Sequence, residues 1–486
     1  MSERPDFAEE KPVVISSAAR PASHPQTNYH MTFIWFICLV AALGGLLFGY
    51  DWVVIGGAKP FYEKFFALSS PAQQGWAMSS ALVGCLVGAL ASGMLSDRFG
   101  RKRLLILSAS MFVVSSIGTA TANLLPVFVA WRIAGGSAIG MASNLSPIYI
   151  AEVAPAKVRG KLVSINQLTI VIGILLAQLD NWLIADKVPP DFTPRQILES
   201  WNGQSGWRWM FGVTAIPAVL FFFGMFAVPE SPRWLAKNGR RERARRVLAR
   251  IGGDAYAGRA LAEIETTLAD ESQKTSLRGL FQPPLMKVLL LGVGLAVFQQ
   301  WCGINVIFNY AEEVFAAAGY KISDILFNIV VTGVVNLIFT FVAIATVDRA
   351  GRRKLMMIGA AGLAVIYTIL GVGFQAHSHG PHMLLLVVAA IGCYGMSLAP
   401  VTWVVISEIF PNRNRGAAMS IATASLWIAC FILTYTFPLL NKGVGAARTF
   451  WIYAAICIVG FLFIKWRLPE TKGKTLEEIE KELTHN

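Results

Sequence analysis

The chain has 486 residues, of which 55% are hydrophobic and only 15% carry a charge. A soluble protein carries about 25% charged residues, so this composition excludes an ordinary soluble enzyme and favours a polytopic membrane protein. The formal net charge of +13 does not indicate nucleic-acid binding, because the basic residues cluster in loops, where they orient a membrane protein.

Twelve segments are long and apolar enough to cross about 30 Å of hydrocarbon, which takes about 20 residues each. Backbone polar groups in lipid must be satisfied within the segment itself, so each segment is expected to be a helix. We place them near residues 33–57, 76–96, 104–123, 126–149, 162–184, 207–228, 286–309, 325–347, 355–375, 383–406, 418–440 and 447–467.

These segments divide the chain into five expected regions. Residues 1–32 are polar, proline-containing and without a signal peptide, and are expected to form a disordered cytoplasmic tail. The ranges 33–228 and 286–468 hold six segments each. Between them, 229–285 is expected to be a cytoplasmic linker with short helices, and 469–486 a second cytoplasmic tail.

Most of the 42 Lys and Arg residues lie in the first tail, in the loops after even-numbered segments and near the C-terminus. Loops rich in Lys and Arg remain in the cytoplasm. This distribution predicts a multi-pass protein of a cell membrane, expected to be a bacterial cytoplasmic (inner) membrane, with both termini in the cytoplasm.

Three short motifs occur once in each half of the chain. SDRFGRK at 96–102 returns as VDRAGRR at 347–353, EVAP at 152–155 returns as EIFP at 408–411, and PESP at 229–232 is echoed by PETK at 469–472. Parallel repeats of this kind are typical of secondary transporters, whose substrate site lies between the halves. The predicted fold is an all-α membrane protein with twelve transmembrane helices in two pseudo-symmetric six-helix halves.

The repeated loops place acids beside bases at the cytoplasmic ends of helices. Exposed ion pairs contribute only about 0–1 kcal/mol each, which suits a gate that forms and breaks in each transport cycle. The alternative is ordinary flanking charge without a gating role. The expected cytoplasmic gate residues are Asp97, Arg98, Arg101, Glu152, Arg159, Asp348, Arg349, Arg352, Glu408 and Arg415.

The seventh segment carries an unusual number of amide side chains for a helix in lipid: Gln299, Gln300, Asn305 and Asn309. Amides offer donors and acceptors without charge, which is the chemistry that binds hydroxyl groups. Flat aromatic faces, on which a sugar ring can stack, are available later in the chain. The alternative is that single amides bond one helix to another. The sequence thus favours a site for a polyhydroxylated substrate.

Asp51 and Arg132 are the two charges that we place deep inside predicted helices. The rise of 1.5 Å per residue puts both about 9 Å below the outer surface. An unpaired charge at a helix centre costs about 2.5–3.5 kcal/mol on insertion scales, so equal depth and opposite sign predict a pair. The alternative role is a static buried salt bridge.

Taken together, the motifs resemble those of the sugar porter family of the major facilitator superfamily, and the resemblance covers about residues 33 to 474. It rests on the stretches GGLLFGYD, SDRFGRK, YIAEVAPAKVRG, PESPRWL, FQQWCGIN, SEIFPNRNRG and PETKG. The chain is most similar in pattern to bacterial proton-coupled pentose and hexose symporters. The resemblance implies that Asp51 and Arg132 couple transport to protons. It also implies that Gln167, Gln299, Gln300, Asn305 and Trp403 contact sugar. Together with Phe48, Asn309 and Trp427, these residues form the expected substrate-binding set.

The chain departs from the pattern of the xylose-transporting members at several positions. Leu426 and Ile174 stand where that pattern has glutamines, and Asn309 stands where it has an aromatic residue. Trp52 follows Asp51 where the family has threonine. These changes leave the sugar open.

The resulting expectation is a secondary active transporter that imports a monosaccharide by proton symport with alternating access. A facilitator without proton coupling and a non-transporting sugar receptor are the alternatives. We expect no enzymatic activity, no cofactor and no metal, because the cysteines and other residues form no recognisable motif. The expected partners are a monosaccharide, protons and the lipid bilayer, with no nucleic acid and with the monomer as the functional unit.

Overall fold

The computed structural model describes residues 29–189, 191–271, 281–410, 415–472 and 478. Within these ranges the regular structure is entirely helical. The expected tails, 1–32 and 469–486, lie mostly outside the described residues.

The helices fall into a first series, a linker and a second series. The first series is α1 (Met31–Phe65), α2 (Pro71–Phe99), α3 (Arg101–Thr121), α4 (Leu125–Val153), α5 (Arg159–Ile184), α6 (Pro194–Glu199), the π-helix η1 (Asn202–Gly206), α7 (Trp207–Val213) and α8 (Ala215–Ala227). The linker holds α9 (Pro232–Lys237) and α10 (Arg241–Glu271). The second series is α11 (Pro283–Trp301), α12 (Ile304–Asn309), α13 (Ala311–Ala317), α14 (Ile322–Ala350), α15 (Arg352–Gln375), α16 (Pro381–Gly395), α17 (Leu398–Ile409) and α18 (Arg415–Arg467).

These helices confirm the predicted all-helical membrane architecture, with three differences in detail. Eleven stretches are long and apolar enough to span a membrane, and the last, Gly416–Arg467, is two spans joined at Gly445, which has a left-handed φ of +85°. The first span was expected to end near residue 57 but continues to Phe65. The sixth, seventh and tenth spans were expected to be continuous, yet each is divided into two helices.

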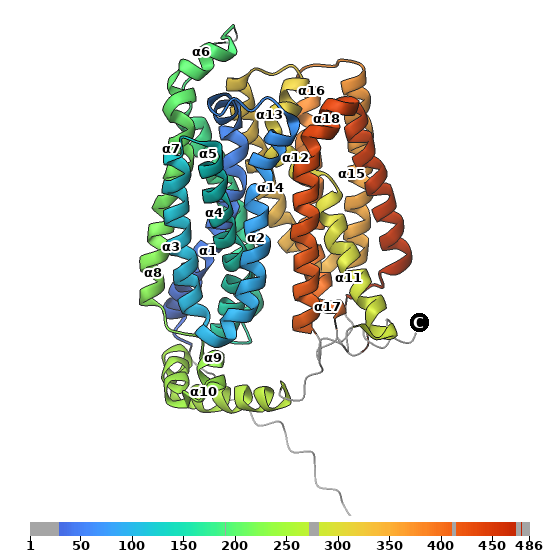
Figure 1. The fold of residues 1–486 in the computed structure, drawn as a ribbon. Coiled ribbons are helices and arrows are strands. Elements are labelled where there is room, and N and C mark those ends of the chain that lie inside the picture. The colour runs from blue at the N-terminus through green and yellow to red at the C-terminus, as the bar shows by residue number, and fades with distance from the viewer. Residues whose placement is uncertain (1–28, 190, 272–280, 411–414, 473–477, 479–486) are drawn as a thin grey trace, which may run out of the picture.

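The two series stand side by side in Figure 1, the first in blue to green and the second in yellow to red. They meet where α2 packs against α18 and α5 against α14. The linker helices α9 and α10 lie beyond one end of the bundle. We call this the linker end, and the opposite end, near α6 and α13, the far end.

The repeated motifs build the same local structure twice at the linker end. The Glu230 carboxylate accepts hydrogen bonds from the N–H groups of Arg101 (3.0 Å) and Lys102 (3.1 Å) at the start of α3. Glu470 accepts one from the N–H of Arg352 (2.9 Å) at the start of α15. Free N–H groups and the positive end of the helix dipole make a carboxylate favourable at each place.

A glycine precedes each of these helices because the carboxylate needs the space. Gly100 has φ +94° and Gly351 has φ +91°, conformations that residues with a side chain rarely adopt. A Cβ atom on Gly100 would lie 2.3 Å from Oε2 of Glu230, and one on Gly351 would lie 2.8 Å from Oε2 of Glu470. In each half, the glycine therefore leaves room for the glutamate carboxylate that caps the helix, and the two residues form one structural unit.

Replacement of this glycine should destabilise the protein. Gly100→Ala forces both a strained φ, worth about 1–3 kcal/mol, and displacement of the Glu230 carboxylate. We expect a lower unfolding temperature for purified protein in detergent. Gly160→Ala is the matched control at the same end, because a Cβ there meets no heavy atom within 4 Å. Equal melting temperatures for the two variants would show that the unit does not stabilise the fold.

Candidate functional site

Two helix breaks face each other in the middle of the bundle. Between α11 and α12 the chain turns at Gly303, which has φ +87°. Between α16 and α17 it is interrupted at Ser397. Across these breaks the Gln299 side chain donates from Nε2 to the carbonyl oxygen of Ala399 at 3.3 Å. Interrupted helices that present polar groups near the bilayer midplane are how transporters build substrate sites.

The amide side chains form a connected chain at the first break. Gln300 donates from Nε2 to Oε1 of Gln299 at 3.1 Å, and Asn305 donates from Nδ2 to Oε1 of Gln300. All three residues are buried. A chain of this kind orients each amide, so the donors and acceptors that remain are preset for a ligand.

A cavity of about 2020 Å³ separates the two helix series beside these amides. Seven of the expected substrate-binding residues line it: Phe48, Gln167, Gln299, Gln300, Asn305, Trp403 and Trp427. Its wall also includes Ser96 of α2, Lys161 of α5, Arg233 of α9 and Thr267 of α10. Because these last residues belong to the linker end, the cavity extends to that end of the bundle.

Three aromatic rings form a triangle on the cavity wall. Phe48 and Trp52 of α1 and Trp427 of α18 lie with ring centroids 6.0–6.1 Å apart. The indole Nε1 of Trp427 is buried without a hydrogen-bond partner among the described residues. The prediction from the sequence did not include Trp52, although its replacement of the family threonine directly after Asp51 was the available signal.

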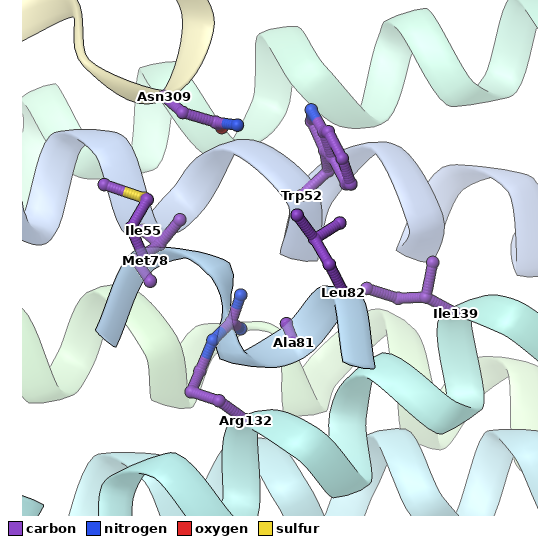
Figure 2. Close-up of a pocket in the computed structure, with 8 residues that line it drawn as sticks. All are labelled: Trp52, Ile55, Met78, Ala81, Leu82, Arg132, Ile139 and Asn309. Atoms are coloured by element: carbon purple, nitrogen blue, oxygen red, sulfur yellow. The ribbon is translucent and has the colours of Figure 1, made fainter. Parts of the chain in front are cut away.

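Asn309 is the expected binding residue that does not line this cavity. It lines a small pocket on the other side of Trp52, together with Arg132 (Figure 2). Ile174 and Leu426, by contrast, line the large cavity. Two positions with an apolar residue in place of an amide thus reach the cavity, whereas the additional amide lies outside it.

Asp51 and Arg132 are in contact, as predicted, although α1 continues to Phe65 and the depth estimate had placed its end near residue 57. Nη1 of Arg132 lies 2.8 Å from Oδ1 of Asp51, and its Nη2 donates to the Asp51 carbonyl oxygen at 3.3 Å. Asp51 is 6% exposed and Arg132 3%. The guanidinium also lies 5.4 Å from the ring centroid of Phe211. The second carboxylate oxygen of Asp51 has no hydrogen-bond partner among the described residues. Only one of the two carboxylate oxygens of Asp51 is therefore hydrogen-bonded.

The sequence analysis missed two further charged residues within helices. Because α1 continues to Phe65, Lys59 is part of it and only 2% exposed. Asp180 lies near the end of α5, where it accepts a hydrogen bond of 2.7 Å from the Tyr50 hydroxyl. The statement that Asp51 and Arg132 are the two deep helical charges is therefore corrected. Lys59 was missed because the first helix was expected to end near residue 57, whereas Asp180 lies inside the expected segment 162–184 and was overlooked.

At the linker end, no described ion pair of the expected gate joins the two helix series, although Asp97 also lies 2.7 Å from Lys237 of the linker helix α9. Arg101 lies 3.0 Å from Glu152 and 3.3 Å from Asp97. Arg352 lies 3.4 Å from Glu408. These pairs are present in a structure whose cavity reaches this end. They hold neighbouring helices of one series together.

The remaining expected gate residues have other positions. Arg98 is exposed and stacks on the ring of Phe99 at 5.3 Å, and Arg159 donates from Nε to the Ala154 carbonyl oxygen at 3.4 Å. The side chains of Asp348, Arg349 and Arg415 lie outside the described part of the structure.

A fold of this kind, with a polar and aromatic cavity between two helix series, defines a secondary transporter of the membrane. A family profile described as "Sugar (and other) transporter" matches residues 37–483. The chain belongs to this family of transporters, which are multi-pass membrane proteins and not enzymes.

Named relatives agree with this assignment. The D-xylose-proton symporter of Escherichia coli (strain K12) is 41% identical over 93% of this chain and 96% of its own length. The arabinose-proton symporter of Bacillus subtilis (strain 168) is also 41% identical, over 94% of this chain and 97% of its own. A solved structure of the xylose transporter XylE from E. coli, in a partially occluded inward-open conformation, superposes with a TM-score of 0.80. It is 38% identical, over 91% of this chain and 100% of that one. XylE bound to 6-bromo-6-deoxy-D-glucose gives a TM-score of 0.76 at 38% identity, over 94% and 100%.

Loss of Arg132 should destabilise the fold, and loss of both partners should do so less. Arg132→Leu leaves the Asp51 carboxylate buried and unpaired, which costs about 3–5 kcal/mol for a buried pair. The double variant Asp51→Asn/Arg132→Leu removes both charges and should regain much of this stability. The measurement is the free energy of unfolding for all four members of the cycle.

The matched control is Arg195→Leu, since Arg195 pairs with Glu199 on the surface at 86% and 62% side-chain exposure. We expect little change for it. If the double variant is less stable than Arg132→Leu, the pair does not act as a coupled unit.

Proposed function

We propose that this protein is a proton-coupled symporter that imports a monosaccharide by alternating access. The observation that carries this proposal is the buried Asp51–Arg132 pair, whose atoms lie 2.8 Å apart, with Trp52 lining both the central cavity and the pocket at Arg132. The names of the relatives, which are proton symporters of xylose, arabinose and galactose, support the same reading.

We place the linker end in the cytoplasm. The support is the concentration of Lys and Arg in the loops and linker at this end, which follows the rule that such loops stay inside. Both termini are then cytoplasmic, and the cavity faces the cytoplasm. The TM-score of 0.80 with an inward-open transporter conformation is in line with this orientation.

The sugar is proposed to bind between the amide chain and the aromatic wall. Gln299, Gln300 and Asn305 offer hydrogen-bonding groups on one side, and Trp403 and Trp427 offer apolar faces. Hydroxyl groups bond to amides and the C–H face of a sugar ring packs on an indole. The apolar Ile174 and Leu426 reduce the number of hydroxyl groups that the wall can satisfy.

Coupling is proposed to run through the charge state of Asp51. While Asp51 is ionised it holds Arg132. Protonation removes the charge, releases the guanidinium and lets the two helix series, 33–228 and 286–468, move relative to each other. One proton that crosses 100 mV supplies about 2.3 kcal/mol, which supports roughly 50-fold accumulation of sugar.

Asp51→Asn should abolish uphill accumulation and spare sugar exchange. The amide retains the size of the side chain and can still bond, but it cannot lose or gain the charge that drives the change. The measurement is sugar uptake into proteoliposomes with an imposed pH gradient, next to counterflow without one. Undiminished accumulation by the variant would leave a facilitator with a static salt bridge as the better description.

Gln299→Ala and Asn305→Ala should each weaken sugar binding. An unpaired hydroxyl or amide costs about 1–3 kcal/mol, or roughly 5- to 150-fold in affinity. Quenching of tryptophan fluorescence reports the binding. The control is Asn328→Ala, since Asn328 is a buried amide of α14 that does not line the cavity. Parental affinity in both cavity variants would mean that the amides serve helix packing alone.

A further inference from the structure

A cluster of four charged side chains joins the two helix series at the far end. Lys59 of α1 places its Nζ 3.2 Å from Glu63 of the same helix. The same nitrogen lies 3.5 Å from Glu312 and 2.5 Å from Glu313, both of α13. The lysine side chain is 3% exposed and the glutamates 13–24%. We call these four residues the Lys59 cluster.

The surrounding contacts make this cluster part of the seal that closes the far end. A Cβ atom on Gly56, one turn before Lys59, would lie 2.8 Å from the carbonyl oxygen of Phe308, so α1 and α12 are in close contact here. The Lys59 ammonium lies 5.7 Å from the ring centroid of Tyr310. The cavity reaches the opposite end, so separation of α1 from α13 would be needed to open this one.

The charges of the cluster do not balance. Three carboxylates face one ammonium, so the cluster carries a net charge of −2 when every group is ionised. Like charges that share a partly buried site cannot all remain ionised without a penalty. A bound proton relieves this penalty and leaves the ammonium shared among fewer anions.

Lys64 adds one positive charge that acts on Glu63, so three carboxylates still face only two ammonium groups. Gln74 of α2 donates to Glu63 at 3.3 Å, and Lys64 donates to the Pro60 carbonyl oxygen at 2.8 Å. The Tyr62 hydroxyl is buried and has no hydrogen-bond partner among the described residues. Outside the four members, the groups that act on the charges of this cluster are Tyr62, which acts on Lys59, and Lys64, which acts on Glu63.

We propose that the Lys59 cluster is a second proton-binding site, separate from Asp51, which keeps the far side of the transporter closed while it holds a proton. When the proton is lost, the Glu63 carboxylate on α1 and the carboxylates of Glu312 and Glu313 on α13 repel each other. This repulsion favours opening of the far end. Because the cluster faces the far side and is remote from the cavity mouth, its proton returns to the side from which it came. The site therefore regulates the cycle and adds nothing to the number of protons transported. This proposal rests on the proposed alternating access and does not depend on proton coupling through Asp51.

The pH range follows from Glu313. Burial, together with the nearby Glu312, raises its pKa from 4.5 to about 7, although Lys59 acts in the opposite direction. When α1 and α13 separate, the carboxyl returns to water and to its ordinary pKa. The closed state is therefore most favoured below about pH 4.5, loses this advantage as the pH rises, and has lost it above about pH 7. Each pH unit in this window changes the ratio of closed to open by up to about tenfold.

The test measures the distance between the two helix series at the far end. Spin labels on Ser69→Cys and Lys442→Cys, both exposed positions, are introduced with the six native cysteines replaced. Double electron–electron resonance of the full-length protein in lipid nanodiscs, without sugar, then reports the fractions of closed and open molecules at pH 5 and pH 8.5. All variants carry Asp51→Asn, so that titration of Asp51 cannot contribute.

We expect the long-distance fraction to rise at least tenfold, relative to the short one, between pH 5 and pH 8.5. Glu313→Gln mimics the protonated group and should stay closed with most of this dependence lost. Lys59→Met removes the ammonium that the carboxylates share, so among the variants it should give the largest fraction of open molecules at pH 8.5. Glu199→Gln, at an exposed pair on the same side, is the matched control and should respond like the Asp51→Asn background.

A distance distribution that does not change with pH in the Asp51→Asn background overturns the proposal. So does an unaltered pH response in Glu313→Gln. Neither result bears on proton-driven accumulation, which the uptake assay of Asp51→Asn tests separately. The first measurement needs no change in the cluster, so a variant that fails to fold does not prevent the decision.

Discussion

The ion pair between Asp51 and Arg132 is the interaction on which the interior of this protein depends. A charge within a helix centre in lipid is unfavourable, and two opposite charges at one depth reduce this penalty only when they touch. Their 2.8 Å contact joins α1 to α4 within the first helix series. Trp52 follows Asp51 in the chain and lines the cavity, so this charge pair lies beside the cavity wall. The Asp51 carboxylate and a ligand in the cavity would therefore act on neighbouring atoms.

The helix breaks give the site its chemistry. A continuous helix satisfies its own backbone and presents only side chains, whereas a break exposes backbone groups that neighbouring side chains can use. Gln299 bonds to the backbone of Ala399 across two such breaks. The amide chain to Gln300 and Asn305 is thereby oriented before any ligand arrives, which limits the entropy lost on binding.

Charges at the two ends of the bundle have different consequences. At the linker end, Arg101 pairs with Glu152 and Arg352 with Glu408 inside their own series, and Glu230 and Glu470 cap α3 and α15. These contacts can survive a movement of one series against the other. At the far end, Lys59 pairs across the boundary with Glu312 and Glu313. Such contacts must break when that end opens, so they affect the balance between the two states.

The sequence by itself determined the membrane class, the helical fold and several polar and aromatic residues of the cavity wall. Hydrocarbon thickness and the need to satisfy backbone groups leave few alternatives for long apolar segments, so their number and approximate limits follow from composition. The pairing of Asp51 with Arg132 followed from equal depth and opposite charge. Seven of the eight expected binding residues line the cavity, four of them amides and three aromatic.

Only the tertiary structure decided where the helices break, where α1 ends and that Lys59 meets Glu312 and Glu313. Helix α1 continues through Pro60 because packing against neighbouring helices outweighs the lost hydrogen bond, and this brings Lys59 to Glu312 and Glu313, more than 250 residues away in the chain. Asn309 lines the small pocket together with Arg132 and not the cavity, although Asn305 of the same helix α12 lines the cavity. Contacts between residues so distant in sequence depend on how whole helices pack, which no local pattern specifies.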